Sequence, residues 1–163
     1  KFQKPTVFES HTIEDNILLA LRAPRSALAT LFGKPKADTR LRIDQILEIT
    51  KLKDHRFRLA ADLSHGQKQW LEIGMLLAQD PKLLLVDEPV AGMTDEETMR
   101  LAQLLNSLRG QCSMMVVEHD MEFVMNLADR VSVLDFGQMI AQGTPKEIQQ
   151  HPAVLQAYLG GVA

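Results

Sequence analysis

Apolar residues in the first half of the chain recur every three to four positions, which is the period of an amphipathic helix. This pattern predicts one helix that begins behind Thr12, one over about 38–51 and one from Ser64 to about Gln79. The residues expected on their buried sides are Ile13, Ile17, Leu18 and Leu21 in the first helix, Leu41, Ile46, Leu47 and Ile49 in the second, and Trp70, Ile73 and Leu77 in the third. Thr12 and Ser64 each stand three residues before an acid or a glutamine, which is typical of a capping box at a helix start.

The second half follows a different pattern, in which short apolar runs alternate with helical segments. Lys82–Asp87 and Ser113–Val117 are continuous apolar runs, which predict strands that are buried on both faces of a sheet. Apolar runs on either side of Gly137 predict a hairpin. The helices expected here are Thr94 to about Arg109, Asp120 to Ala128, a short one from Thr144, and Pro152 to Leu159. Because strand–helix–strand alternation builds parallel sheets, the predicted fold class is α/β, with a parallel-sheet core and an all-helical subdomain.

Composition narrows the class of protein. The 163 residues are 45% hydrophobic and 24% charged, which fits a globular domain with an apolar core. A net charge of -3 gives no overall basic balance, so nucleic acid is not expected as the main partner. The single cysteine, Cys112, begins an apolar run and is expected to be a small core residue in a reducing, intracellular compartment. No apolar run reaches the length of about 18 residues that a membrane-spanning helix needs.

Two neighbouring acids end the first predicted strand. Asp87 and Glu88 follow the run Leu83–Val86, at the carboxyl end of a strand, where α/β sheets bind ligands. Asp87 could take part in the coordination of magnesium, and Glu88 could polarise a water molecule for attack on a phosphate. The alternative is a strand that simply ends in a solvated acidic turn.

The segment Ser64–Gln67 predicts a helix start with unpaired backbone N–H groups. Such a start attracts anions through its donors and the helix dipole, Ser64 adds a hydroxyl, and Gly66 permits close approach of a phosphate. An ordinary helix cap explains the same residues. His119 follows the second predicted strand and could reach a phosphate oxygen and a water molecule; a surface histidine is the alternative reading.

The order and spacing of these segments resemble the ABC ATPase family. Leu63–Gln67 is similar to the family's signature motif, with His65 in place of a usual glycine. Leu83–Glu88 is similar to the Walker B strand, and the resemblance makes Asp87 the magnesium-associated acid and Glu88 the catalytic glutamate. His119 matches the switch histidine. The resemblance therefore implies the ABC ATPase type of P-loop NTPase core.

Two further segments extend the resemblance. Ala91–Thr94 falls at the D-loop, with Thr94 where an aspartate is usual. Gln3 matches the Q-loop glutamine, which in the family touches magnesium and water and senses the membrane subunit. The domain division implied is 1–4 for the remnant of the Q-loop, 5–80 for the helical subdomain and 81–163 for the C-terminal half of the ATPase core.

The stretches around the signature and Walker B segments, and the C-terminal end, look like the urea-type subunits of the branched-chain amino acid and amide uptake branch. The resemblance implies ATP and Mg2+ as ligands, with Ser64, Gly66 and Gln67 binding the nucleotide held by a second ATPase subunit. It also implies transmembrane permease subunits, an extracytoplasmic solute-binding protein that acts indirectly, and a peripheral place on the cytoplasmic face of the membrane. We expect import of urea, short amides or branched-chain amino acids.

A P-loop, G-x-x-x-x-G-K-[ST], is absent from the sequence. The pair Gly33–Lys34 precedes Pro35, and Leu28 stands where the first glycine would be, which predicts a turn. We therefore expect a C-terminal fragment that neither binds ATP tightly nor hydrolyses it alone. Its uncovered sheet edges and apolar faces predict self-association or a partner chain.

Two alternatives belong to other classes of protein. One is a soluble ABC ATPase that serves DNA repair or translation, which would usually carry a long coiled-coil insertion. The short link between Gln3 and Ser64 and the acidic balance favour the transporter. The other is a non-catalytic ABC-like module, against which the presence of both Glu88 and His119 argues.

Overall fold

The computed structural model describes residues 6–21 and 37–159 of the chain. It consists of two compact units, Lys1–Val117 and Glu118–Ala163, which are described separately below. Within the described ranges, no helix has both the length and the apolar character needed to cross a bilayer. The predicted boundaries of the helical subdomain and the ATPase core stay a prediction.

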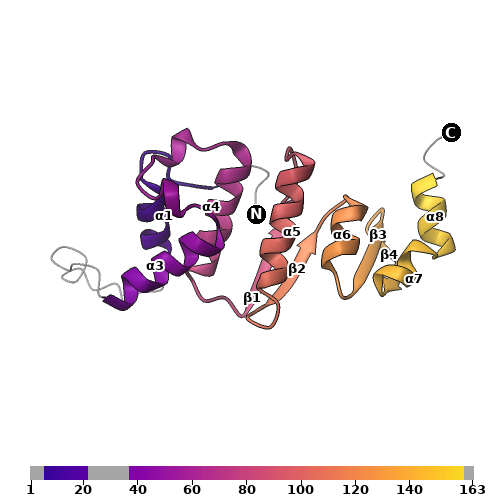
Figure 1. Ribbon diagram of the computed structural model, residues 1–163. Helices are drawn as coiled ribbons and strands as arrows, with labels where there is room; N and C mark the ends of the chain where they lie inside the picture. The colour runs from indigo at the N-terminus through magenta and orange to yellow at the C-terminus, as the bar shows by residue number, and fades with distance from the viewer. Residues whose placement is uncertain (1–5, 22–36, 160–163) are drawn as a thin grey trace. The chain divides into compact units, whose positions relative to one another are not determined.

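The first part of unit one is a helical layer, as the sequence predicts. It contains the helices α1 (Ile13–Ala20), α3 (Ala37–Ile49) and α4 (His65–Leu77) and the short 3-10 turns η1 (Lys53–His55) and η2 (Ala60–Asp62). The three helices contact one another, and Figure 1 shows them grouped around a shared interior. Both predicted capping boxes form, since Thr12 Oγ1 accepts from Asp15 N and Ser64 Oγ accepts from Gln67 N. These caps define where α1 and α4 begin.

One predicted buried position on α3 is wrong. Leu41 is 61% exposed, whereas Ile43, Ile46 and Leu47 are buried. Ile43 lies three and four positions before the other two and shares their side of the helix, and Leu41 lies almost opposite to it. Trp70, Ile73 and Leu77 of α4 are all buried, as predicted.

Gly74 lets α4 pack closely on its neighbours. A Cβ at this position would lie 3.1 Å from Ile46 Cγ2 and 3.2 Å from Thr50 Cγ2, both on or next to α3, and 4.0 Å from Ile17 Cδ1 of α1. The three helices therefore meet at a glycine. Any larger side chain here would push the helices apart, because protein interiors are packed as densely as organic crystals.

A parallel pair of strands follows the helical layer in unit one. Strands β1 (Leu83–Asp87) and β2 (Ser113–Val117) are joined through α5 (Asp95–Ser107), and Figure 1 shows the helix alongside them. The register pairs Leu83 with Ser113 and Asp87 with Val117, so both strands end at the same edge. A parallel pair needs such a crossover connection, and the predicted strand–helix–strand arrangement is confirmed.

The prediction that both strands are buried on both faces is wrong. Burial alternates along β1, where Leu84 and Val86 are buried. Side chains that point to the opposite face are largely exposed: Leu83 53%, Leu85 59%, Met115 60% and Val117 55%. An apolar run fits a strand covered on both faces, but among the described residues only one face of this sheet is covered.

Unit two is a hairpin covered by helices. It contains α6 (Met121–Leu127), β3 (Val131–Asp135), β4 (Gln138–Gly143), α7 (Pro145–Gln149) and α8 (Pro152–Leu159). Its core joins both strands to the last two helices through Val131, Ala141, Ile148 and Val154. The predicted hairpin is confirmed, and its two-residue turn has positive φ at both Phe136 (43°) and Gly137 (77°). This backbone matches the twist of the strands that it connects.

Candidate functional site

Glu88 leaves the end of β1 in an unusual backbone conformation. Its φ is 45°, a left-handed value that costs a residue with a side chain roughly 1–2 kcal/mol. The Glu88 N–H donates to the carbonyl of Val117 at 2.8 Å, which extends the pairing of the two strands by one residue. Asp87 is exposed and Glu88 is half-buried. The sheet therefore fixes two consecutive carboxylates at its carboxyl edge, with the second on a strained backbone of the kind that gathers at functional sites.

A tight turn follows Glu88. The Ala91 N–H donates to the Glu88 carbonyl at 3.3 Å, and the Met93 N–H donates to the Val90 carbonyl at 3.0 Å. Gly92 takes a φ of 74°, which a glycine adopts without strain. The chain thus reverses directly behind the two acids and enters α5, whose first turn begins behind Thr94.

The start of α4 supplies hydrogen-bond donors. Ser64 Oγ accepts from the Gln67 N–H at 3.2 Å, and Gln67 Oε1 accepts from the Ser64 N–H at 3.1 Å. The side chain of Gln67 is therefore engaged in the cap, whereas the hydroxyl proton of Ser64 can still be donated. The first N–H groups of a helix have no acceptor inside it, and its dipole favours an anion there. Lys68 is paired with Glu9 at 2.7 Å, and this contact holds the pKa of the Glu9 carboxyl below its usual value.

His65 connects the α4 start to the acidic strand end. Its Nε2 lies 3.2 Å from the carbonyl oxygen of Ala91, in the turn behind Glu88. In the sequence, His65 is notable only because it replaces a glycine that is usual in segments like Leu63–Gln67. Its contact with Ala91 brings together two segments whose proximity in space the sequence had not indicated.

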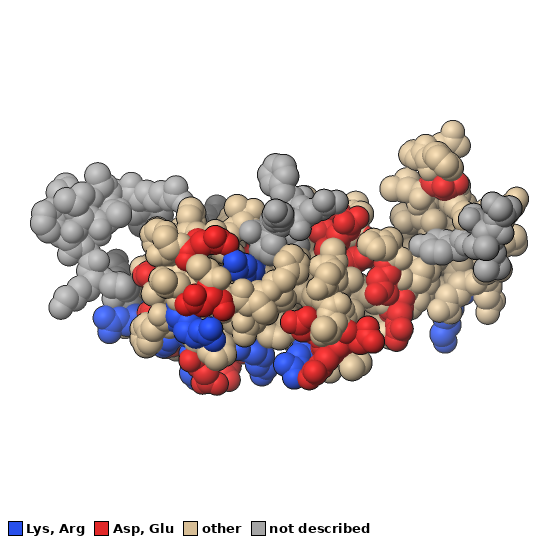
Figure 2. Space-filling view, turned by 90° about the horizontal axis from the view of Figure 1, so that it is seen from above, with Lys and Arg blue, Asp and Glu red and all other residues tan. Residues whose placement is uncertain are grey.

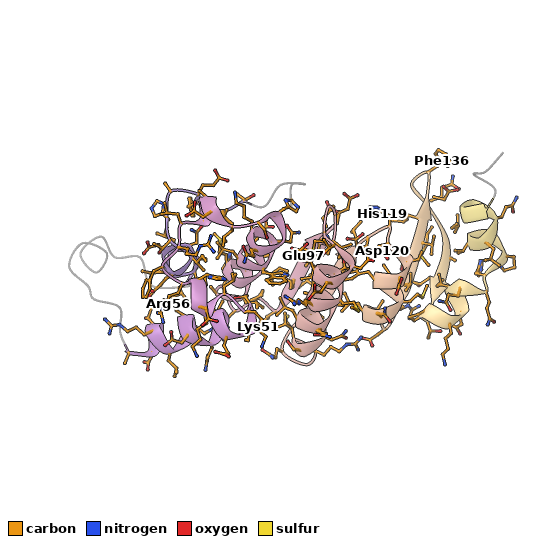
Figure 3. All side chains as sticks on the ribbon, turned by 45° about the horizontal axis from the view of Figure 1, so that its top comes forward. Lys51, Arg56, Glu97, His119, Asp120 and Phe136 are labelled. Atoms are coloured by element: carbon orange, nitrogen blue, oxygen red, sulfur yellow. The ribbon has the colours of Figure 1, made fainter. Side chains whose placement is uncertain are left out.

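Gly66 makes room for a carboxylate. A Cβ on Gly66 would lie 2.6 Å from Glu97 Oε1, while Glu97 Oε2 accepts from the Thr94 N–H at 3.1 Å and lies 3.2 Å from its hydroxyl. Figure 3 labels Glu97 on α5. The sequence indicated close approach of a phosphate at Gly66; in the structure the space beside this glycine holds Glu97. The sequence predicts a helix that starts at Thr94, and the structure shows Glu97 in its capping box, but nothing in the sequence pointed to the contact of Glu97 with α4.

His119 belongs to unit two, where Glu118 holds the backbone around it. Glu118 Oε2 accepts from the N–H groups of His119 at 3.0 Å and Asp120 at 3.4 Å, and Asp120 caps α6 by accepting from Phe123 N at 2.9 Å. The His119 side chain is 77% exposed, with Nδ1 3.8 Å from Glu118 Oε2. Figure 3 labels His119 and Asp120 at this strand-to-helix junction. The role of His119 as the switch histidine stays a prediction, and Gln3 lies outside the described residues, as does the Gly33–Lys34 pair.

The side chains of the described residues meet only part of what a site for phosphate and magnesium requires. No group of three or more His, Cys, Asp or Glu residues within 6–21 and 37–159 could hold a metal ion. Asp87, which is exposed at the sheet edge, has the hard oxygen donors that Mg2+ prefers and could supply one ligand. On the face shown in Figure 2, the Lys and Arg side chains of the described residues are mixed with Asp and Glu and form no continuous basic surface.

Two family models match the chain. The model described as "ABC transporter" matches residues 1–91. The model described as "Branched-chain amino acid ATP-binding cassette transporter" matches residues 138–163. The first covers the segments with Ser64, Asp87 and Glu88, and the second covers the end of unit two.

Similar proteins are bacterial transport ATP-binding proteins. The high-affinity branched-chain amino acid transport ATP-binding protein LivG of Salmonella typhimurium is 34% identical over 168 residues, which cover 98% of this chain and 66% of the relative. The corresponding protein BraF of Pseudomonas aeruginosa is also 34% identical, with the same coverage. The chain thus spans just under two thirds of the length of these relatives.

A solved structure shares the fold. The ATP-binding cassette MJ1267 of an ABC transporter superposes with a TM-score of 0.78 at 30% sequence identity. The match covers 96% of this chain and 66% of that protein. The arrangement of helices and strands described above is therefore one that a solved ATP-binding cassette also has.

Proposed function

This chain belongs to the ABC transporter family, and from that premise we propose that it forms part of the ATP-hydrolysing subunit of an importer. The observation that carries the proposal is the connection of the two acids to the α4 start. Glu88 is tied to β2 through its N–H, and the turn that follows it is tied to α4 through His65 and Ala91. Hydrogen bonds thus connect the carboxylates at the end of β1 with the donors at the start of α4, which attract anions. Such an arrangement suits phosphoryl transfer, because catalysis of that reaction depends on positioning and electrostatics.

Each proposed residue has a separate task. Asp87 supplies one ligand to Mg2+, and Glu88 orients the water that attacks the phosphorus atom. Ser64 donates its hydroxyl proton, together with the first N–H groups of α4, to the terminal phosphate of a nucleotide held by a second ATPase subunit. Bound ATP would supply the phosphoanhydride bond that is broken, with ADP as the leaving group, and Mg2+ would neutralise charge on the phosphate oxygens.

The other proposed site residues act around this centre. Gly66 adds no side chain of its own to the helix start, where the Glu97 carboxylate lies beside it, and Gln67 holds the cap in shape. His119 stabilises the charge that develops on the transferring phosphoryl group. Gln3 touches magnesium and water and senses the membrane subunit; these roles rest on the family resemblance.

The relatives support the proposed substrate class and partners. Their names specify branched-chain amino acid transport, and we propose that class for this chain, with urea and short amides as the finer alternative within the same branch. The subunit works with transmembrane permeases on the cytoplasmic face of the membrane, and with a solute-binding protein indirectly. The transport names of these relatives favour the proposal over the DNA-repair and translation ATPases, and the presence of both Glu88 and His119 favours it over the non-catalytic module.

These 163 residues alone are proposed to be inactive. They contain no P-loop motif to cradle the phosphates of a nucleotide. Calorimetric titration of ATP into the chain should show no binding at micromolar concentrations. Micromolar affinity would contradict the proposal. Reading the coding sequence upstream of Lys1 tests a different point, because it separates the proposed ATPase subunit from a non-catalytic module, which would have no P-loop there.

Replacing the catalytic acid tests the function. In the protein read from the complete coding sequence that contains this chain, Glu88→Gln should lower ATP turnover by about a hundredfold or more, while ATP binding and dimer formation persist. Glu122→Gln, which changes an exposed acid in the first turn of α6, should leave turnover unchanged. Unchanged turnover in Glu88→Gln would remove Glu88 from this role.

A further inference from the structure

We propose that His65 is a positioning residue, whose imidazole fixes the turn behind Glu88 and thereby the carboxylate of Glu88 itself. His65 belongs to the first turn of α4, and neither the comparisons nor the family resemblance gives a role to a histidine at this position. The structural part of the proposal stands on the contacts of unit one. The part that concerns turnover rests on the proposed function.

Three hydrogen bonds form a connected series from α4 to the sheet. His65 Nε2 lies 3.2 Å from the Ala91 carbonyl oxygen, the Ala91 N–H donates to the Glu88 carbonyl at 3.3 Å, and the Glu88 N–H donates to Val117 at 2.8 Å. In this series Ala91 and Glu88 each use both their backbone N–H and their backbone C=O group. The backbone of Glu88 is therefore held from the strand side and from the helix side.

The chemistry of the His65 contact is fixed by its partner. A carbonyl oxygen only accepts hydrogen bonds, so Nε2 must carry the proton that is donated to Ala91. A glycine at position 65 would leave the Ala91 carbonyl to water. The side chain at this position thus decides whether the turn is attached to α4 or is held only by its own short-range hydrogen bonds.

The left-handed conformation of Glu88 explains why the attachment matters. A φ of 45° is costly for glutamate, and the surrounding structure has to over-determine it if it is to persist. Ala91 closes the turn that begins at Glu88, and His65 restrains Ala91. When that restraint is lost, the turn can relax and the Glu88 side chain can leave the orientation that a water-activating carboxylate requires.

Gly92 and Glu97 bring two more groups to the same contact. A Cβ on Gly92 would lie 3.8 Å from His65 Cδ2, so the imidazole lies beside this glycine of the turn. Glu97 lies against Gly66, the residue next to His65. His65 of α4 therefore meets the turn, and the neighbouring Gly66 meets α5, so the start of α4 is in contact with both. His65 donates the side-chain hydrogen bond to the turn.

Two substitutions of similar length separate the hydrogen bond from the bulk of the side chain. His65→Gln keeps a donor close to the place of Nε2, and His65→Met keeps the length but has no donor. Amide hydrogen exchange of Ala91 and Met93 in the 163-residue chain reports on the turn, and the amides of Asn16 and Thr50 in the helical layer serve as references. We expect exchange of the turn amides to rise roughly threefold to tenfold in His65→Met and to stay near the native rate in His65→Gln.

Other results overturn the proposal. These are unchanged exchange of Ala91 in His65→Met, an equal rise in both variants, or a rise that the reference amides share. In the protein from the complete coding sequence, His65→Met should also lower kcat with KM unchanged, and His65→Gln should restore kcat. If Glu88→Gln leaves turnover unchanged, the proposed function fails while the exchange result for His65 still stands or falls on its own.

Discussion

The carboxylate of Glu97 lies where a side chain on Gly66 would otherwise be, with Oε1 2.6 Å from the position of a Cβ atom. The same carboxylate accepts a hydrogen bond from the Thr94 N–H, so one acid both caps α5 and lies against Gly66 at the start of α4. The φ of Gly66 is not positive, so this position does not need glycine for its backbone conformation. It needs glycine because the Glu97 carboxylate occupies the space of a Cβ atom. The acid–glycine contact couples two helix starts that belong to different parts of the sequence.

Substitution of Gly66 by alanine tests this coupling. The new methyl group should displace the Glu97 carboxylate from the Thr94 cap, which destabilises the fold by about 1 kcal/mol. The higher helix propensity of alanine stabilises the fold by about 1 kcal/mol. The net change in the free energy of unfolding should therefore be small. A double-mutant cycle with Glu97→Ala, followed by urea unfolding, should give a coupling energy of about 1 kcal/mol. Simple additivity of the two substitutions would contradict the contact.

Arg56 joins two helices of the helical layer through a bidentate ion pair and a second acid. Its guanidinium lies 3.0 Å from Glu14 of α1 and 2.8 Å from Asp44 of α3, and the hydrogen bond to Glu14 raises the pKa of Arg56. Figure 3 labels Arg56 in this layer. Arg56→Lys should lower the free energy of unfolding by roughly 1 kcal/mol, because one ammonium group cannot hold both carboxylates in the same geometry.

Arg40→Lys, at an exposed position of α3, is the matched control and should change little. Chemical denaturation at low and high salt checks the mechanism, since screening should reduce the difference between Arg56→Lys and the native chain. A difference that is the same at both ionic strengths would mean that Arg56 acts through packing.

Glu147 gives unit two a predicted pH dependence. The Thr144 N–H and hydroxyl lie 2.7 Å and 2.9 Å from Glu147 Oε2, and these hydrogen bonds, the backbone one first, hold the pKa of Glu147 below its ordinary value of 4.5. A depressed pKa in the folded state means that the charged form stabilises the fold above the unfolded value and that this stability is lost as the pH falls through the folded value.

The native chain should therefore be more stable than Glu147→Ala at neutral pH, and the difference should shrink once the pH falls below about 4.5. Thermal unfolding at a series of pH values, followed by circular dichroism, provides the measurement. An advantage of the native chain that increases toward acid pH would show that the cap does not depend on the charge of Glu147.

The sheet face that is exposed among the described residues predicts association. The alternating side chains Leu83, Leu85, Met115 and Val117 are each more than half exposed on neighbouring strands. Contiguous apolar surface of this kind favours contact with another chain. Light scattering at high concentration should detect dimers or larger species, and Leu85→Lys with Met115→Lys should reduce them. Leu41→Lys, at an exposed apolar position outside the sheet, serves as the control. A native chain that stays monomeric at high concentration would exclude this role.

The acidic strand end and the α4 start were both predictable as separate segments. A capping box involves residues three apart, and both predicted boxes form, at Thr12 and Ser64; the structure adds two more, at Thr94 and Thr144. The parallel pairing of β1 with β2 follows from the alternation of strand and helix, and the hairpin follows from the apolar runs around Gly137. These features are local, so residue type and spacing carry enough information to indicate them.

Burial and long-range contact were decided by tertiary structure. The apolar runs of β1 and β2 indicated two covered faces, but coverage depends on which other segments pack there, and one face is exposed among the described residues. The bond between His65 and Ala91 joins residues 26 positions apart. No periodicity encodes such a pairing, because it arises only when α4 and the turn behind Glu88 are brought together by the packing of whole elements.

The sequence by itself thus determined the helix starts, the strand order and the two acids at the end of β1. Only the tertiary structure decided that Glu88 takes a left-handed backbone, that Gly66 faces Glu97 and that His65 restrains Ala91. The physical reason is the range of the interactions involved. Capping and alternation act over a few residues, whereas strain and side-chain contact between elements depend on the packed fold.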